Sequence, residues 1–148
     1  MKHVLLIACL LGSCSIAAAQ KPLYATDWPG WDLLLQVRFE TRLYKGERMY
    51  WPVLSDKIKA AHNKPLRLKG YLIPMQAGQT HLTFYLSLKP ESECFFCGGG
   101  GPESIVEVTA TQPVPYSYTP IMLVGTLVVN DSDPNQMLYR LIGAKLAQ

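Results

Sequence analysis

The feature that most constrains the fold of this chain is a series of five short segments in which apolar and polar residues alternate or apolar residues form a short run. These segments are residues 66–75, 81–88, 104–110, 121–129 and 138–146. Alternation with a period of two is typical of β-strands that bury one face. In the second segment it predicts that Leu82, Phe84, Leu86 and Leu88 lie on the buried face.

Five strands of this length predict a mostly β domain. Gly70 and Gly125 interrupt the first and fourth strands, where they would permit a bend or a close backbone approach. This pattern favours a small closed barrel of the oligonucleotide- and oligosaccharide-binding type, and a β-sandwich is the alternative. In the barrel interpretation the proline-rich segment 112–120 is extended and replaces the usual helix between the third and fourth strands.

The region ahead of the five strands predicts smaller elements. Residues 20–32 are a lead-in segment, and residues 33–40 alternate as an additional half-buried strand at the start of a single domain, 33–148. A turn follows at 44–47. One short helix is then expected before the barrel, with Ser55 as its cap and Asn63 near its end.

The first 19 residues predict a cleavable signal peptide. A positive start precedes an apolar stretch, and Ala17, Ala18 and Ala19 provide the small residues that signal peptidase needs, with cleavage before Gln20. Residues 11–14 also match a lipobox, so lipidation of Cys14 and a membrane anchor are the alternative. Either route predicts an exported protein of the periplasm or envelope. Removing 19 of 148 residues leaves 129, enough for one domain.

Charge and composition exclude several function classes. The net charge of +3 comes from 14 basic and 11 acidic residues without a basic run, which argues against nucleic-acid binding. No Ser-His-Asp arrangement and no phosphate-binding loop is recognisable. We therefore expect a protein that is not an enzyme.

The segment with the clearest chemistry is Cys94-Phe95-Phe96-Cys97, which four glycines follow. Two thiols at this spacing can hold a soft metal ion, Zn²⁺ or Cu⁺. Because an exported protein meets oxidising conditions, a disulfide is the other outcome. Glycine amides turned toward the sulfurs would lower the thiol pKa values. A c-type haem would need a histidine in place of Gly98.

A metal held by Cys94 and Cys97 would need further ligands. The barrel layout places the start of the first strand, just after His62, at the same end as the cysteine loop, so His62 is the best third ligand. Glu103 is the nearest carboxylate on the third-strand side. The alternative for His62 is a solvent-facing helix terminus, where a protonated imidazole favours the helix dipole.

Three segments also resemble a family of uncharacterised bacterial exported proteins and lipoproteins: residues 70–75, 94–104 and 130–134. The Cys-Phe-Phe-Cys-Gly-Gly motif is the specific part, and the resemblance covers about residue 31 to the end. It implies a barrel of the oligonucleotide-binding outline, and a metal-handling role or a role as an accessory to an ABC-type transporter. Two hypotheses follow: an exported metal-binding protein, or a non-enzymatic envelope binding or scaffold domain with a Cys94–Cys97 disulfide.

Overall fold

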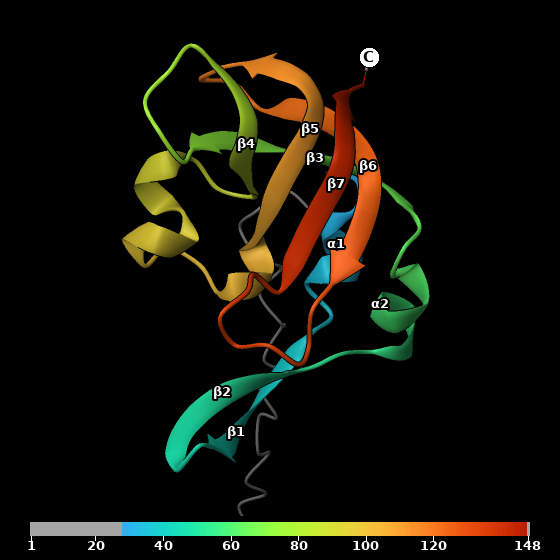
Figure 1. The fold of residues 1–148 in the computed structure, drawn as a ribbon, viewed down its shortest axis with the longest axis vertical. Coiled ribbons are helices and arrows are strands. Elements are labelled where there is room, and N and C mark those ends of the chain that lie inside the picture. Colours follow the sequence, from blue (N-terminus) through green and yellow to red (C-terminus); the bar gives the residue numbers. More distant parts are fainter. Residues whose placement is uncertain (1–27, 148) are drawn as a thin grey trace, which may run out of the picture.

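The computed structural model describes residues 28–147, so the predicted leader and Cys14 lie outside the described residues. Two short helices and seven strands follow one another along the chain (Figure 1): α1 Trp31–Leu34, β1 Arg38–Tyr44, β2 Glu47–Val53, α2 Asp56–Ala61, β3 Pro65–Pro74, β4 Thr80–Ser87, β5 Ile105–Pro115, β6 Ile121–Val129 and β7 Tyr139–Leu146. Three 3-10 turns lie between β4 and β5: η1 Glu91–Glu93, η2 Phe95–Cys97 and η3 Pro102–Ser104. No helix among residues 28–147 is both long and apolar enough to cross a membrane.

Five strands close into a barrel in the order β3-β4-β5-β7-β6. All neighbours are antiparallel except β5 and β7, which run parallel, with Glu107 opposite Arg140. The closed five-stranded barrel confirms the predicted architecture and excludes the sandwich. The two strand glycines lie at close approaches: a Cβ at Gly70 would stand 2.7 Å from the Ser87 carbonyl oxygen, and one at Gly125 would stand 2.9 Å from Leu141 Cγ.

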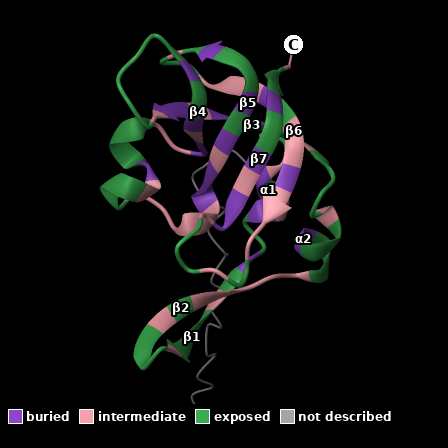
Figure 2. Ribbon diagram, in the orientation of Figure 1, coloured by how far each residue is buried: buried purple, intermediate pink, exposed green. Residues whose placement is uncertain are grey.

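Alternating side chains of the five strands fill the barrel. The fully buried side chains of the barrel interior include Leu68, Phe84, Leu86, Val106, Val108, Leu123, Leu127 and Leu141. Burial of one such side chain stabilises a fold by about 2 kcal/mol. Figure 2 shows the same alternation as bands of buried and exposed residues along β4, β5 and β7.

The inner face of β4 differs from the prediction at its start. The pairing with β5 shifts between His81 and Thr83, which marks a β-bulge. A bulge adds one residue and reverses which side chains face inward. Leu82 is therefore 50% exposed and His81 is buried, whereas Phe84, Leu86 and Leu88 are buried as expected.

The strand predicted for residues 33–40 is wrong over residues 33–37. Trp31–Leu34 form a helical turn, and β1 begins only at Arg38. Trp31 and Leu34 lie three residues apart on one face of this turn and are both fully buried. The Trp31 indole donates a hydrogen bond to the Lys69 carbonyl oxygen at 2.6 Å. The buried Tyr139 hydroxyl donates a hydrogen bond to the Leu34 carbonyl oxygen at 2.8 Å. These contacts with β3 and β7 make α1 part of the core.

The cap of α2 and the extended segment after the third predicted strand agree with the sequence prediction. The Ser55 side chain accepts a hydrogen bond from the Ile58 amide at 3.3 Å and caps α2, and Asn63 leaves the helix with a φ of 59°. The first half of segment 112–120 is indeed extended, because it continues β5 as far as Pro115 and pairs with β4. In the described chain no helix lies between β5 and β6.

One end of the barrel gathers most of the irregular structure. Helix α1 contacts η3 and α2 there, and the connection between β6 and β7 adjoins the start of β5. Beyond this end, β1 and β2 form a separate two-stranded sheet that stands away from the barrel (Figure 1).

Candidate functional site

The cysteine loop connects β4 to β5 and is tied to both strands. The Leu88 amide donates to the Ser104 carbonyl oxygen at 3.0 Å, and the Ser104 hydroxyl donates to the Gly101 carbonyl oxygen at 2.7 Å. Ser104 is only 5% exposed. The Lys89 ammonium also donates to the Gly99 carbonyl oxygen. The loop therefore begins and ends at fixed points, and a backbone turn shapes its middle.

That turn carries both cysteines. The Cys94 carbonyl oxygen accepts two hydrogen bonds of 3.0 Å, one from the Cys97 amide and one from the Gly99 amide. The Gly98 amide donates to the Phe95 carbonyl oxygen, and Gly98 has a φ of 78°. The bond from Gly99 to Cys94 encloses the bond from Gly98 to Phe95, and Gly98 is left-handed; this arrangement is the Schellman motif. The first two glycine amides thus bind carbonyl oxygens, so the expected orientation of these two amides toward the sulfurs is wrong.

Gly99 is required by the same turn for a steric reason. A Cβ at this position would lie 1.9 Å from the Glu93 carbonyl oxygen and 2.4 Å from the Glu93 carbonyl carbon. No side chain fits there unless backbone moves.

The turn brings the two sulfur atoms to 3.9 Å from each other. Cys94 is buried and Cys97 is exposed, and both are free thiols. A disulfide needs a separation of about 2.0 Å. Two sulfurs on one tetrahedral zinc ion, each at about 2.3 Å, would be about 3.8 Å apart. The observed separation therefore matches two ligands of one metal ion more closely than it matches a disulfide.

The electrostatic environment favours the protonated form of the exposed thiol. The pKa of Cys97 is raised above its usual value, first because its side chain shares a hydrogen bond with Cys94. Partial desolvation and the charges of Cys94 and Glu91 raise the Cys97 pKa further. The lowered thiol pKa expected from the glycine loop is thus not present at Cys97, and a metal would have to displace protons to bind.

The structure does not bring His62 to the cysteines. His62 caps α2, and its Nδ1 accepts a hydrogen bond from the Val129 amide at 3.0 Å. A neutral imidazole that accepts at Nδ1 carries its proton on Nε2, so neither nitrogen offers a free lone pair. Val129 ends β6, and β6 neighbours neither β4 nor β5 in the barrel. His62 therefore lies at the predicted end of the barrel but on another side of it.

Glu103 follows the cysteines in η3, but its carboxylate turns back on its own loop. Both carboxylate oxygens lie within 2.4 Å of the Cβ position that a side chain at Gly101 would occupy. The pKa of Tyr139 is raised first by burial and second by the negative charge of Glu103. Within residues 28–147, no cluster of three or more His, Cys, Asp or Glu side chains has a geometry that could hold a metal ion.

The connection between β6 and β7 is a polar turn that its own side chains hold together. Asn130 Oδ1 accepts from the Asp133 amide at 3.0 Å, and Asp133 Oδ1 accepts from the Asn135 amide at 3.0 Å. The Asn135 amide and the Gln136 side chain hold the pKa of Asp133 below its usual value. The Asp133 carboxylate is engaged within its own turn.

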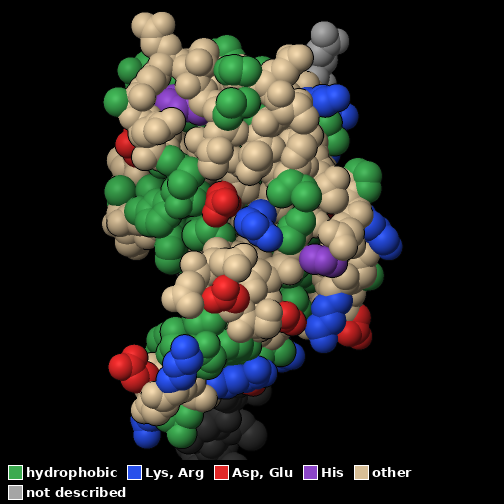
Figure 3. All heavy atoms as spheres, viewed as in Figure 1, with side chains coloured by type: hydrophobic (Ala, Val, Ile, Leu, Met, Phe, Trp, Pro, Cys, Tyr) green, Lys and Arg blue, Asp and Glu red, His purple; other side chains and the backbone are tan. Residues whose placement is uncertain are grey.

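An aromatic stack beside the cysteines is only weakly indicated by the sequence. The Tyr85 and Phe96 rings lie 4.8 Å apart between centroids, and Phe95 and Phe96 lie 5.4 Å apart. Phe96 is 54% exposed. Figure 3 shows hydrophobic side chains gathered over the cysteine loop and the adjoining part of β4. The exposed Cys97 therefore lies in a loop with an apolar surface.

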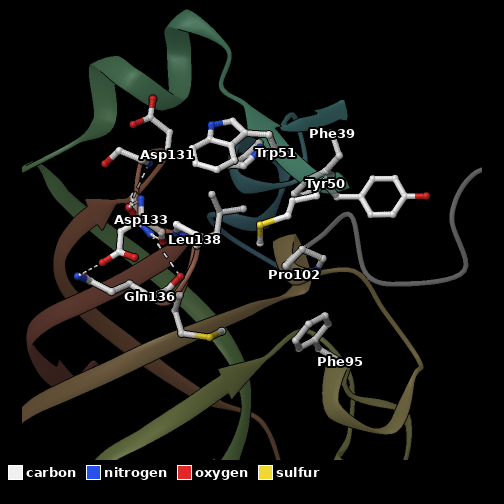
Figure 4. A pocket seen from close by; sticks show the side chains of 15 residues that line it. Phe39, Tyr50, Trp51, Phe95, Pro102, Asp131, Asp133, Gln136 and Leu138 are labelled. Atoms are coloured by element: carbon white, nitrogen blue, oxygen red, sulfur yellow. Dashed lines mark hydrogen bonds between the residues drawn. The ribbon is translucent and has the colours of Figure 1, made fainter. Parts of the chain in front are cut away.

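A groove of about 270 Å³, which sequence reasoning missed, separates the cysteine loop from the β1–β2 hairpin. Trp51, Pro102 and Leu138 line it from three segments that are distant in the sequence. In Figure 4 the Trp51 indole lies over Leu138, Pro102 faces both, and the Tyr50 ring points away from the groove. The only signal in the sequence is the apolar run that contains Trp51, which local pattern cannot relate to the cysteine loop.

Comparison of the chain with protein-family models, with curated proteins and with solved structures gives no match. The resemblance based on the Cys-Phe-Phe-Cys-Gly-Gly motif thus stays a prediction, and the fold and the dithiol turn are the basis for assigning a function.

Proposed function

We propose that this chain is an exported metal-binding protein in which Cys94 and Cys97 bind one soft metal ion, Cu⁺ or Zn²⁺. It would deliver or accept this ion at an envelope partner such as an ABC-type transporter. The observation that carries the proposal is the 3.9 Å separation of two free sulfurs in a turn fixed by backbone hydrogen bonds. Thiolate ligands select soft ions over hard ones.

The number of ligands supports an exchange role for the site. Zinc in a structural site takes four ligands from the protein, whereas the described residues offer only the two sulfurs together. The other positions would come from water, a small thiol or the partner protein. Because Cys97 is exposed, an incoming ligand could reach the metal from its side while Cys94 stays buried.

The coordination number favours Cu⁺ over Zn²⁺ in the isolated protein. Monovalent copper is soft and binds stably to two thiolates, whereas zinc would remain half-coordinated by protein. The raised pKa of Cys97 adds a proton cost for either ion, so binding of both should strengthen as the pH rises.

The test is native mass spectrometry of the reduced chain, titrated with Cu⁺ or Zn²⁺ without oxygen. We expect one ion per chain and the loss of two protons. The double variant Cys94→Ser, Cys97→Ser should bind none, whereas the control Phe96→Ser changes an exposed side chain in the same loop and should bind normally. Equal affinity of the double variant and the parent would reject the dithiol site.

The groove beside the hairpin favours a second candidate function, that of a non-enzymatic envelope binding or scaffold domain. In this case the sulfurs would close from 3.9 Å to a disulfide that stiffens the loop beside Trp51 and Leu138. The same mass measurement on unreduced protein separates the two functions. A mass two hydrogens light without metal supports the scaffold, and a metal-bound mass supports the exchange site.

A further inference from the structure

The β1–β2 hairpin is the part of the described chain with the least support from its surroundings. It forms its own two-stranded sheet, and its outer half is exposed in Figure 2. Leu43 is 75% exposed and Tyr50 is 81% exposed. An isolated two-stranded sheet is only marginally stable in water, and its open edges are ready to pair with another strand.

The two edges of this sheet are not equivalent. Pro52 pairs with Phe39, and proline has no amide hydrogen to donate. Pro52 therefore suits a position where its nitrogen points away from β1, which removes one donor from the free edge of β2 near the end of that strand. Strand β1 contains no proline. The edge of β1 thus keeps all of its donors and is the better edge for a further strand.

The same pairing fixes which groups point outward from β1. Because Pro52 has no amide hydrogen to donate to Phe39, this pair fits the non-hydrogen-bonded positions of the antiparallel ladder. The alternation along the ladder then turns the amide and carbonyl groups of Phe39, Thr41 and Leu43 toward the free edge. Thr41 is the midpoint of the seven-residue strand. A second β1, antiparallel and centred on Thr41, would use all three residues and overlap along the full strand.

We propose that the chain forms a symmetric homodimer in which two β1 strands pair antiparallel about Thr41, giving one four-stranded sheet. In this register Glu40 lies opposite Arg42 of the second copy, and Arg42 lies opposite the Glu40 of that copy. Phe39 lies opposite Leu43 of the second copy. The pairing is self-complementary, as a two-fold interface requires, and no two like charges face each other.

The charged side chains available for this contact are about half exposed in the single chain. The Glu40 and Arg42 side chains are 51% and 48% exposed and form an ion pair with each other on one face of β1, and the Arg42 guanidinium lies 5.8 Å from the centroid of the Trp51 ring. Leu43 meets solvent until a second copy covers it. This homodimer is independent of the proposed metal function, because its contacts exclude the cysteine loop.

A charge exchange tests the register. Glu40→Arg places an arginine opposite Arg42 of the other copy, and Arg42→Glu places a glutamate opposite its Glu40, so each variant should dimerise at least about tenfold more weakly. A mixture of the two variants restores opposite charges at every pair. We therefore expect light scattering after size exclusion to show monomers of each variant and a heterodimer after mixing. A parent that stays monomeric at high concentration, or variants that dimerise like the parent, would overturn the proposal.

A cysteine probe tests the centre of the pairing in the exported full chain. Facing residues of a hydrogen-bonded pair have Cα atoms about 5.5 Å apart, within the range of a disulfide. Thr41→Cys should therefore cross-link two chains on a non-reducing gel, whereas Leu43→Cys, whose counterpart lies four residues along the strand, should not. Equal cross-linking by both variants, or by neither, counts against the register.

Discussion

Gly99→Ala is the substitution that most sharply tests how the cysteine turn is built. The added Cβ would lie 1.9 Å from the Glu93 carbonyl oxygen, and the neighbouring atoms belong to backbone that no rotamer change can move. Relief of this contact requires a backbone shift of about 1 Å or more, which breaks the 3.0 Å hydrogen bond from the Gly99 amide to Cys94. The lost hydrogen bond is worth about 1 kcal/mol and the overpacking about 1–3 kcal/mol.

We therefore expect Gly99→Ala to lower the free energy of unfolding by about 2–4 kcal/mol and the melting temperature by roughly 10 °C. Gly98→Asn is the matched control in the same turn. Gly98 has a φ of 78°, and a Cβ added there would have no atom within 4 Å, so asparagine meets no obstacle. Because asparagine tolerates the left-handed conformation, this variant should lose no more than about 1 kcal/mol.

The thiols report whether the turn itself has moved. In the reduced parent protein, alkylation followed by mass spectrometry should modify the exposed Cys97 quickly and the buried Cys94 slowly. Both thiols should react at similar rates in Gly99→Ala, while Gly98→Asn keeps the difference. A Gly99→Ala protein that melts with the parent and still protects Cys94 would refute the steric reasoning.

Three further substitutions test other parts of the structure. Tyr139→Phe leaves the buried Leu34 carbonyl oxygen without its 2.8 Å hydrogen bond and should cost about 1–3 kcal/mol in denaturant unfolding, with no change in the slope. His81→Phe removes two buried ring nitrogens that have no hydrogen-bond partner among the described residues, so it should stabilise the domain by up to about 1 kcal/mol. Cys94→Ala removes the main cause of the raised Cys97 pKa, and alkylation of Cys97 at a fixed pH of about 8 should become faster. Since the Cys97 pKa is raised by folding, its contribution to stability is complete below the unfolded pKa and is lost as the pH rises through the folded value.

Most of the barrel can be predicted because its signals are local. The sequence predicts the fourth strand at 121–129, and β6 spans Ile121–Val129. Two features cannot be predicted from local pattern. The bulge between His81 and Thr83 decides which side chain is buried, but it depends on the pairing with β5. The helical turn at Trp31 is selected by a contact with Lys69, which lies 38 residues away.

The candidate site divides in the same way. Cys94 and Cys97 come together because a single turn spans them, so their spacing in the sequence is sufficient. A third ligand depends on the position of each loop around the barrel. His62 lies at the predicted end, yet its place next to β6 and its bond to the Val129 amide follow from the closed order of the strands.

Removal of metal distinguishes an exchange site from a structural one. The Schellman turn, the Leu88–Ser104 hydrogen bond and the apolar core are all built from contacts between protein groups. We therefore expect a chelator to leave the circular dichroism spectrum unchanged. Bound metal should raise stability only by mass action, about 2.7 kcal/mol at a free metal concentration one hundred times the dissociation constant. The double variant Cys94→Ser, Cys97→Ser should melt like the metal-free parent. Unfolding of the parent by the chelator would show that the metal bound to the two sulfurs is needed for folding. That result would exclude an exchange site, because the fold of an exchange site does not depend on the ion.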